Sequence, residues 1–182
     1  MTSHPVHRHP TRGAARRLFL ACGVLLTLAA CSGGDEPVGP CPQLQLLKDT
    51  DRLVRFVGEG RDLTDVEFEA ALRQPFLSCE YDDDVVEALV IVNLVALRGP
   101  ADDDRVAEVA YFVAIADRNK AVVAREEFSV EIPFEGNQTQ VVVTEEVEPR
   151  IPLQAQEIGT DYRVYVGLRL TPDELQYNQE NR

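Results

Sequence analysis

Alternation of apolar and polar residues dominates the chain from residue 43 onward and predicts β-strands, because a strand with one buried face repeats every two residues. Three segments show this pattern, with apolar positions at Val66, Phe68, Ala70 and Leu72; at Phe128, Val130, Ile132 and Phe134; and at Tyr162, Val164, Val166, Leu168 and Leu170. Residues 85–97 and 109–116 are apolar almost throughout. Such runs are typical of central strands covered on both faces.

Turn-forming residues separate these segments. They cluster at residues 81–84, 98–104, 117–120 and 135–138. This spacing predicts an all-β sandwich of about seven strands rather than βαβ units. Thr171 is a candidate N-cap, and the proline that follows it suits the first position of a short C-terminal helix. We therefore expect a single sandwich domain over residues 41–182.

The first 30 residues have the pattern of a secretion signal. Residues 1–17 contain four arginines and no acidic residue, and residues 18–30 are mostly apolar. A membrane-spanning helix needs about 20 apolar residues, so a signal peptide over residues 1–30 is favoured over the alternative of a membrane anchor. Residues 16–20, Arg-Arg-Leu-Phe-Leu, also resemble the twin-arginine export signal. Twin-arginine export and general secretion both stay open.

Residues 28–31, Leu-Ala-Ala-Cys, resemble the lipobox of bacterial lipoproteins. The resemblance implies that the Cys31 thiol receives a diacylglycerol, that a peptidase cuts before Cys31, and that the new amino terminus is acylated. Two or three acyl chains hold a protein stably on a membrane. We expect Cys31 to anchor the protein in the cell envelope, on the inner or outer membrane facing the periplasm, and residues 31–40 to form a flexible tether.

The composition of the processed chain limits which partners it can bind and which reactions it can catalyse. Residues 1–30 contain four of the 18 basic residues and none of the 31 acidic ones, so 14 basic and 31 acidic residues remain and the formal charge is −17. Nucleic acid and anionic membrane surfaces are therefore poor partners. All histidines, at positions 4, 7 and 9, are also removed. Without imidazole, the usual general base and metal ligand, we expect no cofactor, no metal and no enzyme activity.

Two cysteines remain for a disulfide. Cys22 leaves with the signal peptide and Cys31 is used by the lipid, which leaves Cys41 and Cys79 in an oxidising compartment. We predict that they form a bond and close a loop of about 38 residues, worth roughly 3–4 kcal/mol. The alternatives are two separate buried thiols or a metal site built on the two cysteines.

Three polar segments have two interpretations each. Asp82–Asp84 and Asp102–Asp104 are the dense acidic clusters. We interpret each either as a solvated turn or as a calcium-binding loop. Residues 125–132, Arg-Glu-Glu-Phe-Ser-Val-Glu-Ile, read as a strand with an exposed acidic face or as an edge strand that pairs with a partner. No serine lies in a nucleophile elbow or an S-x-x-K motif.

Residues 158–166, Ile-Gly-Thr-Asp-Tyr-Arg-Val-Tyr-Val, resemble the corner and penultimate strand of fibronectin type III and other immunoglobulin-like domains. The resemblance implies an immunoglobulin-like sandwich in which the Tyr162 hydroxyl bonds to nearby backbone. The segments Cys41–Gly58, Ser78–Val86, Val123–Ile132 and Tyr162–Leu175 also resemble small proteobacterial lipoproteins that carry no assigned function. We expect a non-catalytic binding or scaffolding module with an envelope protein partner. The alternative is a calcium-dependent or carboxylate-based envelope enzyme.

Overall fold

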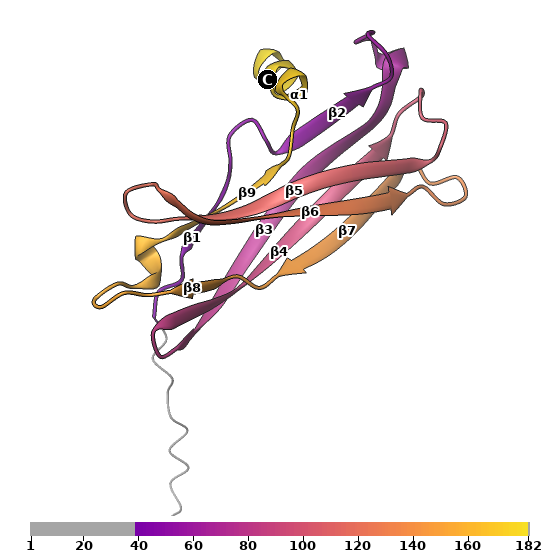
Figure 1. Ribbon diagram of the computed structural model, residues 1–182. Coiled ribbons are helices and arrows are strands. Elements are labelled where there is room, and N and C mark those ends of the chain that lie inside the picture. The colour runs from indigo at the N-terminus through magenta and orange to yellow at the C-terminus, as the bar shows by residue number, and fades with distance from the viewer. Residues whose placement is uncertain (1–38, 182) are drawn as a thin grey trace, which may run out of the picture. The chain divides into compact units, whose positions relative to one another are not determined.

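Nine strands, rather than about seven, form within residues 39–181, which are the residues that the computed structural model describes (Figure 1). The strands are β1 (Gln43–Leu46), β2 (Arg52–Phe56), β3 (Val66–Asp82), β4 (Val85–Arg98), β5 (Val106–Ala116), β6 (Val122–Pro133), β7 (Gln140–Val147), β8 (Arg150–Pro152) and β9 (Arg163–Leu168). The helical elements are the 3-10 turns η1 (Leu63–Asp65) and η2 (Gly159–Asp161) and the α-helix α1 (Pro172–Glu180). β1 and β8 have four and three residues, too few to show an alternating pattern in the sequence.

The strands pack as two sheets, which confirms the predicted sandwich. One sheet has the order β1-β9-β5-β6, and the other has the order β2-β3-β4-β7 with β8 also paired to β4. β1 runs parallel to β9, whereas the neighbouring strands in both sheets otherwise run antiparallel. β6 is an edge strand, as one interpretation of residues 125–132 predicted. The segment 158–166 forms η2 and β9, the last strand of the described residues rather than the penultimate one.

The core lies between the sheets and is built from alternate residues of each strand. β4 and β5 are central in their sheets, as predicted. From Tyr111 to Ala116, β5 is buried on both faces. In β4 only the inward residues are buried, and the outward ones stay half-buried or exposed. Coverage of β4 on both faces was therefore a wrong prediction, because its outer residues have only their neighbours within the sheet for cover.

A β-bulge at Gln74 and Pro75 divides β3 into two parts with opposite alternation. Before it, Arg73 pairs with Asn93, and after it Phe76 pairs with Ile91, so two residues of β3 lie opposite one residue of β4. Proline has no N–H to donate to a ladder, and a bulge is one of the few places in a sheet where it fits. The bulge turns Phe76 to the outside of the sandwich.

The C-terminal helix begins as the sequence predicted. Thr171 accepts a hydrogen bond from the Glu174 backbone N–H, the Glu174 carboxylate accepts one from the Thr171 N–H, and proline occupies the first helical position. α1 packs against β2 through Phe56 and Tyr177, whose ring centroids are 5.2 Å apart. The buried Asn178 amide donates to the Arg52 carbonyl at 2.7 Å. The helix therefore belongs to the domain.

Candidate functional site

The predicted disulfide pair is brought together. The sulfur atoms of Cys41 and Cys79 are 2.02 Å apart, and their Cα atoms are 5.7 Å apart. Cys41 precedes β1 and Cys79 lies on β3, so the pair joins the two sheets. Cys31, the predicted lipidation site, lies outside the described residues.

At the same end of the domain, the Tyr81 side chain links the segment before β1 to the η2 turn. Its hydroxyl donates to the Pro40 carbonyl and accepts from the Gly159 N–H, both at 2.8 Å. A Cβ atom on Gly159 would lie 2.4 Å from the Pro40 oxygen, so only glycine permits this approach. Pro40 is the last residue of the predicted tether. The chain is thus held to the domain at Pro40 and at Cys41.

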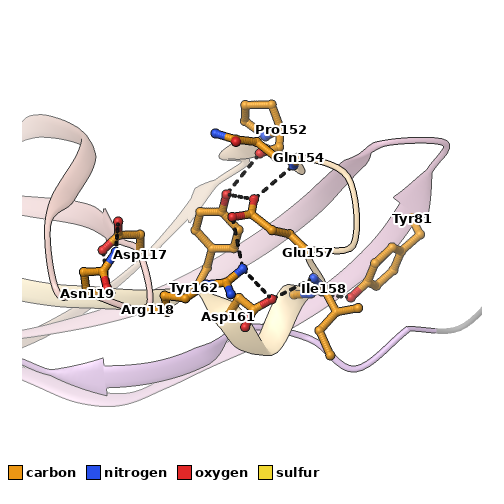
Figure 2. Close-up of polar contacts among 11 residues, drawn as sticks. Tyr81, Asp117, Arg118, Asn119, Pro152, Gln154, Glu157, Ile158, Asp161 and Tyr162 are labelled. Carbon is orange, nitrogen blue, oxygen red and sulfur yellow. Dashed lines mark hydrogen bonds and ion pairs between the residues drawn. The ribbon is translucent and has the colours of Figure 1, made fainter.

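Tyr162 forms the corner that the sequence predicted, but its main partner is a carboxylate (Figure 2). The hydroxyl donates to Glu157 at 2.7 Å and lies 3.3 Å from the Pro152 carbonyl. The Glu157 hydrogen bond, burial and the nearby negative charge raise the pKa of Tyr162 to about 12. The same hydrogen bond lowers the pKa of Glu157. Arg118 also pairs with Glu157 at 3.2 Å. These groups are engaged with one another, which makes this network a structural corner.

The two acidic clusters behave differently. Asp82–Asp84 include the exposed turn between β3 and β4, as predicted. Asp102 is buried, which the solvated-turn prediction missed. Its carboxylate bonds to the Arg98 guanidinium and accepts from the Arg105 N–H at 2.8 Å. Burial alone would raise the pKa of Asp102, but these hydrogen bonds outweigh it and lower the pKa. Residues 39–181 contain no group of three or more His, Cys, Asp or Glu side chains arranged to hold a metal ion.

The outer face of the five-stranded sheet carries a row of apolar side chains, here called the apolar strip. It follows β4 and extends onto β3 and β7 through register pairs such as Phe76 with Ile91 and Val95 with Val142. The strip consists of Phe76, Leu89, Ile91, Val95, Leu97 and Val142. A polar row of Arg73, Asn93 and Thr144 crosses it between Ile91 and Val95 and divides it into two apolar parts. Phe76 and Val142 are each 56% exposed, and Leu97 is 40% exposed.

A cavity of about 370 Å³ lies at the Leu89 end of the strip. Its polar lining includes the carboxylates of Glu80, Glu87 and Glu148 and the guanidinium of Arg150. Glu80 lies directly across from Glu87 in the β3–β4 register, which places like charges side by side. Arg150 pairs with Glu87 at 2.9 Å. We call this the acid-lined cavity; the sequence did not point to it, because its residues come from distant segments.

Further cavities lie near Arg55 and the start of α1. Two of them, of about 460 and 360 Å³, share Arg55 and Glu108 in their linings. The Arg55 guanidinium is already paired with Glu174 at 2.8 Å and lies 5.4 Å from the centre of the Phe68 ring. Its charge is thus engaged within the domain. The apolar strip has no such internal partner among the described residues, and it is the candidate functional site.

Comparisons with family models, with curated proteins and with solved structures give no match. Among the described residues, no helix has the length and apolar character needed to span a membrane.

Proposed function

We propose that this protein is a lipid-anchored, non-catalytic binding or scaffolding module of the cell envelope, and that it engages its partner through the apolar strip. The exposure of Phe76 and Val142 on an uncovered sheet face is the observation that carries the proposal. Clusters of exposed apolar side chains on a protein surface commonly mark interaction sites. Anchoring through Cys31, on the periplasmic side of the inner or outer membrane, presents this face to other envelope components.

Anchoring and binding are tested separately. Radiolabelled palmitate should enter the wild-type protein and not the Cys31→Ser variant. Label that persists in the variant refutes the anchor.

Binding is tested by placing a photo-crosslinking amino acid at Phe76, at Val142 or at Ser129, and irradiating cells. Ser129 lies on the outer face of the other sheet and serves as the matched control. The same adduct should form from positions 76 and 142 and not from 129. Adducts that form equally from all three positions, or from 129 alone, refute a partner on the strip.

The non-catalytic part has its own test. Turnover of a cell-wall glycan or ester by the purified protein, abolished by a single Asp or Glu substitution that leaves the fold intact, refutes it.

A further inference from the structure

The apolar strip has the dimensions of one α-helix. Leu89 and Leu97 mark its ends on β4. At about 3.3 Å per residue these ends are about 26 Å apart, and three strands at about 4.8 Å spacing make it about 10 Å wide between the outer strands. A helix is about 10–12 Å across and rises about 1.5 Å per residue, so roughly 18 residues cover the strip. The outer face of an antiparallel sheet is commonly solvated, and where such a face is apolar the layers that cover it in folded proteins are helices or a second sheet.

The charges around the strip are predominantly negative. Glu69 and Glu146 border it in register with Leu97 and Ile91, and the acid-lined cavity adds three glutamates at one end. The basic groups on this face are Arg73, which lies in the middle of the strip beside Asn93, and Arg150 in the cavity. Arg52, in register with Ala71, is bonded to backbone carbonyls of α1 and of the residue after it. Charge complementarity therefore favours a cationic partner over an acidic one.

The same charges argue against a second copy of this chain as the occupant. Two copies that pack strip to strip would bring their acidic borders together, and the whole processed chain has a formal charge of −17. Repulsion between like charges opposes such a pairing. The acid-lined cavity adds to this repulsion between two copies. It contains three carboxylates, among them the neighbouring Glu80 and Glu87, and one arginine.

We infer that the apolar strip binds one amphipathic helix of a partner protein, about five turns long, whose apolar side meets the sheet and whose borders carry Lys or Arg. A Lys or Arg near one end of that helix reaches into the acid-lined cavity. This inference rests on the proposed function, because it names the partner of the same surface.

Two synthetic 18-residue helices test the inference. Both have the same leucine face; one has lysines along the borders and the other has glutamates. Each carries a fluorophore and is titrated by anisotropy with the purified full-length protein in an uncharged detergent. We expect the lysine peptide to bind at least tenfold more tightly than the glutamate peptide.

Three double variants, one of them a control, separate the apolar and the charged contributions. Phe76→Ser with Val142→Ser should lower the affinity for the lysine peptide at least tenfold. Val122→Ser with Val123→Ser removes two similarly exposed valines from β6 and should leave binding unchanged. Glu80→Lys with Glu148→Lys should invert the preference between the peptides. All the substituted side chains are exposed, so we expect each variant to fold. Circular dichroism checks the fold of each variant before the titration.

Four results overturn the inference. Equal affinity for the two peptides refutes recognition of the peptide's charge. Equal losses of affinity in the Phe76–Val142 and the Val122–Val123 serine variants show that the peptide associates with the detergent or with no particular face of the protein. A dimer in sedimentation that Phe76→Ser with Val142→Ser abolishes assigns the strip to a second copy. If the cellular adducts from positions 76 and 142 persist while the lysine peptide fails, the binding function stands and only the cationic helix is refuted.

Discussion

Replacement of Asp102 by alanine should destabilise the domain far more than its position in an acidic turn indicates. The Asp102 side chain is only 1% exposed, whereas that of Arg98 is 26% exposed. The substitution leaves the Arg105 N–H without its acceptor and the Arg98 guanidinium without its counterion. Arg105 in turn donates to the Phe134 carbonyl at 2.7 Å, so the change reaches the segment that follows β6.

The expected cost follows from the partners that are left behind. Removing one partner of a buried ion pair costs about 3–5 kcal/mol. Arg98 retains some water and a hydrogen bond to the Asp102 carbonyl at 3.0 Å, which places the expected loss nearer about 2–3 kcal/mol. For a domain of this size each kcal/mol lowers the melting temperature by about 2–4 °C, so we expect a drop of roughly 5–10 °C. Asp102→Asn retains an oxygen for the Arg105 N–H and should lose about half as much.

Thermal unfolding followed by far-ultraviolet circular dichroism measures these changes at pH 7, with Asp103→Ala as the exposed control. The control should stay within about 0.5 kcal/mol of wild type. Because the pKa of Asp102 is lower in the folded protein than its ordinary value of 3.8, the unfolded chain binds the proton first as the pH falls. The stabilisation is complete above that value and is lost as the pH falls through the folded pKa. Equal melting temperatures for Asp102→Ala and Asp103→Ala would refute this reasoning.

Three other substitutions test the remaining contacts. Reduction of the Cys41–Cys79 bond, or serine at both positions, should lower the free energy of unfolding by about 3–4 kcal/mol, because the bond closes a loop of 38 residues. The loss is measured from the midpoint of urea unfolding. Two thiols that can be alkylated in the untreated protein would contradict the bond. Tyr111→Phe should raise stability by about 1 kcal/mol, because the buried Tyr111 hydroxyl has no hydrogen-bond partner within the described residues; a clear loss of stability reveals a partner such as a bound water. Gly159→Ala should cost about 1–3 kcal/mol through the clash with the Pro40 carbonyl, with the half-exposed Ile158→Ala as control; equal melting temperatures for the two variants argue against the close approach.

The class of the fold can be predicted from the sequence, because the signals for strands and helix caps are local. Alternation with a period of two marks a strand wherever its partner lies, and it located β9 and parts of β3 and β6, whereas continuous apolar runs located most of β4 and β5. The Thr171–Pro172 cap is complete within four residues of the helix start. The Tyr162 corner is local as well, since both of its acceptors lie within ten residues along the chain.

The candidate site cannot be predicted from the sequence, because its geometry depends on the register between distant segments. Phe76 lies outside because the bulge at Gln74 and Pro75 shifts the pairing of β3 with β4. A shift of one residue moves every later side chain to the opposite face. Pro75 is a local sign of an interrupted ladder, but the residues of β4 and β7 that lie beside Phe76 are set only by the pairing of the strands. The acid-lined cavity likewise forms where β3, β4 and the segment 148–150 meet. The burial of Asp102 has the same origin: its turn looks solvated in sequence, and it is buried because residues 98–105 fold back over the carboxylate.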